Sequence, residues 1–183
     1  MVFLILGLLL WSGAHFFKRI APDARARMGD RGKGAMALVM VLGIVLMVVG
    51  YRAMDFIQVW SPPSFFGHIN NLLILFAFIL LGAGKSQGVL FRKMRHPMLA
   101  GVKVWAFGHL MVNGDVASMI LFGGLLAWAV IQMIMINKSE PNWTAPDGGS
   151  IANDFKTIVI GTLVFAVVAG LHIWLGPNPF GGV

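Results

Sequence analysis

The sequence contains no cysteine. This absence excludes disulfides, thiolate metal ligands, a cysteine nucleophile and the C-x-x-C-H motif that attaches haem covalently. Any metal that the chain binds must therefore be held by histidine, methionine or carboxylate side chains.

Charged residues are scarce as well. They make up 11% of the chain, and only seven residues are acidic. No acidic residue lies three or four positions from a histidine, and none of the seven falls in the middle of an apolar run. Hydrolytic metal sites and paired-carboxylate catalysis are therefore disfavoured. The P-loop, the dinucleotide fingerprint and the G-x-S-x-G elbow are also missing from the sequence.

Apolar residues dominate what is present: 58% of the chain is hydrophobic and the mean hydropathy is +0.82. Crossing a hydrocarbon layer of about 30 Å takes roughly 17 to 25 helical residues. We therefore predict an all-α, polytopic transmembrane bundle of about six helices, forming one integral membrane domain over residues 1–183. The predicted spans lie near residues 1–17, 35–54, 65–84, 97–113, 116–136 and 157–176.

Local patterns refine this prediction. The first apolar segment has neither a basic region ahead of it nor an A-x-A cleavage site, so we expect it to be retained as a span. The sequence Asn-Gly-Asp at 113–115 predicts a tight turn, and hence a helical hairpin. Gly123 with Ala127, and Ala166 with Gly170, have the small-x-x-x-small spacing that lets helices approach closely.

The distribution of lysine and arginine predicts the orientation. Residues 18–34, 85–96 and 137–156 hold six, four and two of the fourteen basic residues, whereas the opposite loops hold only Arg52. Because positive loops stay cytoplasmic, both termini should face away from the cytoplasm. The net charge of +7 is explained by these span ends, so we predict membrane lipid and no nucleic acid as a partner.

The five histidines separate by depth in this topology. His15 and His96 lie toward the cytoplasmic face, whereas His68, His109 and His172 lie toward the other face. His96 and His109 are thirteen residues apart on one helix, which is about 20 Å, so they cannot share an ion. His15 with His96 is a permitted pair, and so is any pair among the other three. Hydrogen bonding to a neighbouring helix remains the alternative for each of them.

A possible anion site surrounds His96. Pro97 suits the first turn of a helix, which makes His96 the expected N-cap residue with unpaired backbone amides nearby. Arg92 and Arg95 lie just before it, and Lys103 lies about two turns beyond it on nearly the same face. These cations and the helix dipole would attract a carboxylate or a phosphate, although Lys103 can also snorkel toward the interface.

Two stretches carry a resemblance to a known family. WSGAHFF at 11–17 and RHPMLAGVKVWAFGHLMVNGD at 95–115 resemble the NnrU family of small integral membrane proteins, and the resemblance extends over essentially the whole chain. Its R-H-P-x-x-x-G-x-x-x-W-x-x-x-H core is far more specific than R-H-P alone.

The resemblance implies haem binding. NnrU proteins are similar to the membrane-bound 15-cis-zeta-carotene isomerase, a b-type haem protein with histidine ligands. The histidine motifs of that family match His15 and His96, so the resemblance implies haem b with these two as axial metal ligands. Arg92, Arg95 and Lys103 would pair its propionates or another anionic group. The family name further implies a link to nitrite and nitric oxide reduction in denitrifying bacteria. We therefore expect the chain in the bacterial inner membrane, where the charge distribution predicts both termini to be periplasmic.

Other functions remain open at this stage. The R-H-P motif is shared with isoprenylcysteine-type membrane methyltransferases, which use S-adenosylmethionine. Those enzymes carry an acidic motif after the next helix, where this chain has NKSEPNW with only Glu140. A non-catalytic assembly or transport partner is a further alternative. The sequence specifies no reaction, catalytic residue or protein partner, and it leaves a second site among His68, His109 and His172 open.

Overall fold

The structure is a computed structural model that describes residues 1–84, 86–176 and 178–180; Lys85 of the predicted cytoplasmic loop lies outside the described residues. Over these ranges the chain is all-α and has no strand. Its helices are α1 (Val2–Ile20), α2 (Pro22–Arg27), α3 (Arg31–Arg52), α4 (Phe66–Ala83), α5 (Pro97–Val112), α6 (Val116–Ser139) and α7 (Ile151–Leu175).

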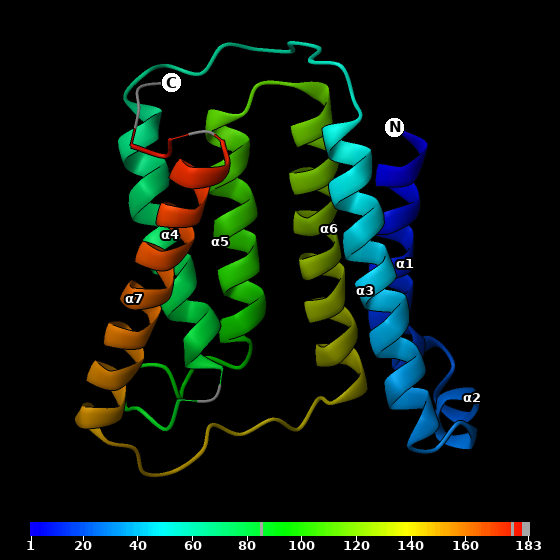
Figure 1. Cartoon of the computed structure of the whole chain (residues 1–183). Coiled ribbons are helices and arrows are strands. Elements are labelled where there is room, and N and C mark those ends of the chain that lie inside the picture. The colour runs from blue at the N-terminus through cyan, green and yellow to red at the C-terminus, as the bar shows by residue number, and fades with distance from the viewer. Residues whose placement is uncertain (85, 177, 181–183) are drawn as a thin grey trace. The chain divides into compact units, whose positions relative to one another are not determined.

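The chain is divided into two compact units (Figure 1). Unit 1 comprises Met1–Val59 and Asp115–Pro141 and contains α1, α2, α3 and α6. Unit 2 comprises Trp60–Gly114 and the chain from Asn142 onward, and contains α4, α5 and α7. Each unit therefore combines an N-terminal part of the sequence with a more C-terminal one.

All six predicted helices are present, and α2 is an additional short helix. Five of the helices, α1, α3, α4, α6 and α7, are long and apolar enough to cross a membrane. The fourth predicted span, α5, is a shorter apolar helix of 16 residues. Helix α7 begins at Ile151, earlier than predicted, because the Ser150 side chain accepts a hydrogen bond from the Ala152 amide and caps the helix.

Unit 1 is built on a close antiparallel pair, α1 and α3, which lie side by side in Figure 1. Glycines make this approach possible. A Cβ atom at Gly7 would lie 2.6 Å from the Gly43 carbonyl oxygen, and one at Gly50 would overlap the backbone of Leu4. Helix α6 also packs against α1, where the side chain of Leu8 fills the space beside Gly124.

Gly123 and Gly170 make no close approach within their own units, since a Cβ atom at either position would meet no described atom within 4 Å. The spacing of small residues alone does not indicate which face of a helix packs against another helix. Gly7 on α1 and Gly43 and Gly50 on α3 make the close approaches instead. The two glycines of α3 are about two helical turns apart, so both lie on the side that faces α1.

Unit 2 is organised around α4, which packs against both α5 and α7. A Cβ at Gly101 would lie 2.9 Å from the Ala77 carbonyl oxygen, and a Cβ at Gly108 would lie 2.9 Å from Asn70 Oδ1. Helix α5 therefore runs antiparallel to α4 along most of its length, so it covers the same depth despite having only 16 residues.

The predicted turn at 113–115 is confirmed, because α5 ends at Val112 and α6 begins at Val116. Asp115 caps α6 by accepting hydrogen bonds from the Ser118 amide at 2.9 Å and the Ser118 hydroxyl at 2.6 Å. The hydroxyl of Tyr51, the only tyrosine, lies 2.9 Å from Ser118 Oγ. This network fastens the start of α6 to the end of α3 within unit 1. Because α5 and α6 belong to different units, the packing of the predicted hairpin stays a prediction.

Large apolar side chains remain exposed on every long helix, among them Leu38 on α3, Leu72 on α4 and Leu163 on α7. Hydrocarbon, not water, is the solvent that such surfaces require. The chain is a multi-pass membrane protein.

Candidate functional site

His15 lies on the side of α1 that meets α6 in unit 1. Its Nδ1 atom lies 2.8 Å from the carbonyl oxygen of Trp11, one turn earlier on the same helix. A carbonyl oxygen can only accept, so Nδ1 carries the proton of this bond, and in the neutral ring Nε2 then keeps its lone pair. This hydrogen bond is the one that orients many metal-binding histidines.

Two indole rings surround this imidazole. The ring centroid of His15 lies 4.4 Å from that of Trp11 and 4.7 Å from that of Trp128 on α6, and the two tryptophans are 5.3 Å apart. The three rings form an aromatic cluster that fixes the imidazole against α6. Sequence reasoning singled out His15 but not Trp128, because the pairing of α1 with α6 had no local signal.

Several polar atoms beside this cluster are buried without a partner. The indole N–H groups of Trp11 and Trp128, and the side-chain oxygen of Gln132, make no hydrogen bond within the described part of the chain. Trp128 and Gln132 are each only 6% exposed. Buried polar groups are normally satisfied, so this side of α6 is suited to a polar group that the chain itself does not supply.

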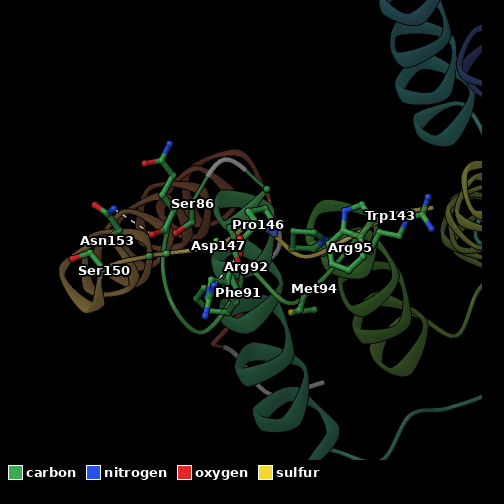
Figure 2. Close-up of a pocket in the computed structure, with 16 residues that line it drawn as sticks. Ser86, Phe91, Arg92, Met94, Arg95, Trp143, Pro146, Asp147, Ser150 and Asn153 are labelled. Carbon is green, nitrogen blue, oxygen red and sulfur yellow. Dashed lines mark hydrogen bonds between the residues drawn. The ribbon is translucent and has the colours of Figure 1, made fainter. Parts of the chain in front are cut away.

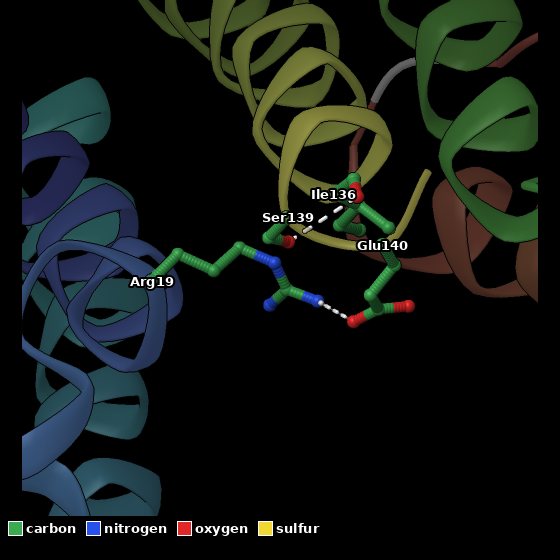
Figure 3. A network of polar contacts seen from close by, with 4 residues as sticks. All are labelled: Arg19, Ile136, Ser139 and Glu140. Atoms are coloured by element: carbon green, nitrogen blue, oxygen red, sulfur yellow. Dashed lines mark hydrogen bonds and ion pairs between the residues drawn. The ribbon is translucent and has the colours of Figure 1, made fainter. Parts of the chain in front are cut away.

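An ion pair joins the ends of α1 and α6. Arg19 donates from Nη2 to Glu140 Oε1 at 3.1 Å, and Ser139 donates to the Ile136 carbonyl oxygen beside it (Figure 3). Glu140 is the acidic residue that the methyltransferase alternative had available. It is paired with Arg19 in unit 1, whereas the R-H-P motif belongs to unit 2, so a shared site of the two stays a prediction.

His96 occupies the predicted N-cap position of α5, with Pro97 in the first turn. Its carbonyl oxygen accepts the Ala100 amide at 2.9 Å, but its side chain makes no capping hydrogen bond. The imidazole is half-buried in unit 2. His15 belongs to unit 1, so the pairing of the two predicted ligands stays a prediction.

The predicted cations do not all share one surface. Arg92 and Arg95 line a cavity of about 670 Å³ in unit 2 (Figure 2). Lys103 is half-buried in α5 and is not among the residues that line this cavity. The expected cluster of three cations therefore divides into an arginine pair and a separate lysine.

The cavity lies among the end of α4, the loop before α5 and the loop before α7. Arg92 donates from Nη1 to the Pro146 carbonyl oxygen at 2.8 Å. The guanidinium carbon of Arg95 lies 5.9 Å from the ring centroid of Trp143, a cation–π distance, and the two side chains are drawn together in Figure 2. Asp147 also lines the cavity, as an exposed residue.

A buried carboxylate holds the wall of this cavity. Asp154, which is only 3% exposed, accepts the Val89 amide at 2.8 Å and the Leu90 amide at 3.1 Å. Gly88 lies against the same carboxylate, because a Cβ atom there would overlap it. The Ser150 amide adds a hydrogen bond to the Gln87 carbonyl oxygen at 3.1 Å. No local pattern indicates a role for Asp154, because its partners are backbone groups 64 and 65 positions away.

The remaining histidines are only partly brought together. His109 and His172 both line a small cavity of about 50 Å³ in unit 2, which Asn70 also lines; His68 does not line it. Asn70 Oδ1 is buried and has no hydrogen-bond partner among the described residues. No group of three or more histidine or acidic residues able to hold a metal occurs over residues 1–84, 86–176 and 178–180. A second metal site is therefore not supported by a further side-chain ligand.

Comparison with known proteins gives one match. The family described as NnrU protein matches residues 3–179, nearly the whole chain. No curated protein and no solved structure matches the sequence.

Proposed function

Because the chain belongs to the NnrU family, we propose that it binds one haem b in the membrane and takes part in nitrite or nitric oxide metabolism. The environment of His15 is the observation that carries this proposal. Its Nδ1 lies in hydrogen-bonding distance of the Trp11 carbonyl oxygen, so the neutral ring would present at Nε2 the lone pair that an iron ligand needs.

Aromatic and polar groups next to His15 also support this proposal. The rings of Trp11 and Trp128 provide flat apolar surface next to the imidazole. Their indole N–H groups are buried and unpartnered within the described residues, so a polar edge of a ligand would satisfy them. The absence of cysteine agrees with a haem that is held without covalent attachment.

His96 is the second proposed axial ligand. It lies at the start of α5, and its side chain makes no hydrogen bond that caps this helix. Lys103, on the same helix, is the proposed partner of a propionate, and Arg92 and Arg95 are proposed to bind a propionate or another anionic group.

A bound haem supplies a one-electron redox centre and an iron that can take small ligands. The chain itself contributes the two imidazoles, the aromatic walls and the cations that fix the orientation of the ring. Its apolar helices exclude bulk water from this environment.

The proposal is tested by the absorption spectrum of the detergent-purified protein after expression with added haem. We expect a Soret band and the spectrum of a six-coordinate, low-spin iron with two histidine ligands. His96→Ala should retain part of the haem and shift it to a high-spin form, because His15 remains. No Soret band in the unaltered protein would contradict haem binding, whereas an unchanged spin state in His96→Ala would contradict only the role of His96.

The link to nitrogen metabolism needs its own experiment. Deleting the gene in a host that grows on nitrite should slow the consumption of nitrite or nitric oxide, and the His15→Ala protein should fail to restore the rate. If the His15→Ala protein fully restores the rate, the role of the protein in nitrogen metabolism does not depend on His15.

A further inference from the structure

Two cavities of unit 2 share a wall at the cytoplasmic end that the charge distribution predicts. The cavity of about 670 Å³ that contains Arg92 and Arg95 adjoins a second cavity of about 260 Å³. Ser86, Gln87 and Asn153 line both of them. The two cavities therefore lie next to each other, on either side of these three residues.

The lining carries an excess of positive charge. Arg92 and Arg95 line the larger cavity and Lys156 lines the smaller one, against the single carboxylate of Asp147. The carboxylate of Asp154 is turned to backbone amides and is nearly inaccessible. The balance attracts an anion, and guanidinium groups match the oxygens of phosphate well.

The arginines are held in place before any ligand arrives. Arg92 is fixed by its hydrogen bond to the Pro146 carbonyl oxygen, and its Nε is buried without a partner among the described residues. Gly149 allows the close contact between the two loops, since a Cβ there would lie 3.3 Å from Arg92 Cδ. Arg95 rests over the Trp143 ring (Figure 2). Such preorganisation reduces the entropy lost on binding.

The smaller cavity leads away from these polar loops onto the apolar helices. Gly82 of α4 and Ile160 of α7 line it together with Thr157. Ile160 is exposed, and so is Leu163 further along α7. An apolar chain that leaves the cavity would therefore continue along a surface that faces hydrocarbon.

We propose that these two adjoining cavities bind an anionic glycerophospholipid, with its phosphate beside Arg92 and Arg95 and an acyl chain along α7 from Ile160. Free phosphate shares the anionic chemistry, but it would leave the apolar continuation of the smaller cavity unused. The cytoplasmic leaflet, where the loops are predicted to lie, is the one rich in anionic lipid. This site goes beyond the haem proposal, and it assigns the two arginines to a lipid in place of a propionate.

The test compares the lipid bound to the unaltered protein and to the double variant Arg92→Gln, Arg95→Gln. Both are purified in detergent, stripped of lipid and titrated with phosphatidylglycerol, zwitterionic phosphatidylcholine or inorganic phosphate, and bound lipid is counted by native mass spectrometry. We expect selective binding of phosphatidylglycerol, weakened about tenfold or more in the double variant. The matched control is Arg25→Gln, Arg27→Gln on α2, which removes the same charge from unit 1 and should leave lipid binding unchanged.

Three results of the titrations would overturn the inference. The first is that the control variant loses as much bound phosphatidylglycerol as the Arg92, Arg95 variant. The second is that the unaltered protein binds phosphatidylcholine as well as phosphatidylglycerol. The third is that it binds inorganic phosphate as tightly as phosphatidylglycerol. Haem content is measured in the same samples. If the Arg92, Arg95 variant loses haem but still binds lipid, the two arginines bind the haem propionates and the lipid inference is also overturned. A protein without haem that binds phosphatidylglycerol selectively would contradict the haem proposal and support this one.

Discussion

The Nδ1 atom of His15 lies 2.8 Å from the carbonyl oxygen of Trp11. His172 makes the same bond on α7, with Nδ1 lying 2.8 Å from the Val168 carbonyl oxygen. The bond alone therefore does not identify an iron ligand. His15 differs from His172 in its surroundings. Two indole rings pack against the imidazole of His15, whereas His172 is an exposed residue.

The contact between α1 and α3 predicts which glycines tolerate a side chain. Gly50→Ala should destabilise the protein by about 1–3 kcal/mol, because the added Cβ would overlap the Leu4 backbone and push the helices apart. Thermal unfolding in detergent measures this. Gly13→Ala on α1 is the control, because its Cβ meets no described atom within 4 Å, and a gain of up to about 1 kcal/mol is expected there. Equal stability of the two variants would contradict the packing of unit 1.

We predict that the carboxylate of Asp154 keeps the loop before α5, which contains Arg92 and Lys93, in its folded conformation. Asp154→Ala removes the acceptor of the Val89 and Leu90 amides, which costs about 1–3 kcal/mol for buried groups left unpaired. We expect trypsin to cleave the variant faster after Arg92 and Lys93, as followed by mass spectrometry of the fragments. Asp147→Ala changes an exposed carboxylate and should leave the cleavage rate as it is. Equal rates in both variants would show that Asp154 does not hold the loop.

The orientation can be tested by single cysteines, because the chain has none of its own. Ser64→Cys precedes α4 and should react with a membrane-impermeant maleimide in intact cells with a permeable outer membrane. Ser139→Cys at the end of α6 should react only after the inner membrane is opened, since the loop that follows it is predicted to be cytoplasmic. The reverse pattern would invert the predicted topology.

Much of the fold was predictable, because its causes are local in sequence. Charge-free apolar runs predict the long helices, and Pro97 predicts both the start of α5 and the N-cap position of His96. The predicted start of α7 was too late, because the residues before position 157 are polar and the apolar pattern begins only there. The helix begins at Ile151, after the N-cap residue Ser150. The glycine contacts were missed because spacing does not reveal which helices become neighbours.

The candidate sites were less predictable, since their partners lie far apart in the sequence. His15 and the cationic residues before His96 stand out as polar groups at the ends of apolar segments. Trp128 and Gln132 do not, because nothing local in α6 shows that it packs on α1. Trp143 joins Arg95 from a loop that carries no motif, and so the cavity could not be anticipated.

The most direct test of the central claim is the haem content of His15→Ala measured against that of His172→Ala. Both substitutions remove an imidazole whose Nδ1 lies 2.8 Å from a carbonyl oxygen one turn earlier on its helix. After purification with added haem, the pyridine haemochrome assay should find about one haem per chain in the unaltered protein and in His172→Ala, and at least about tenfold less in His15→Ala. Equal haem content in the two variants would contradict the assignment of His15 as an iron ligand.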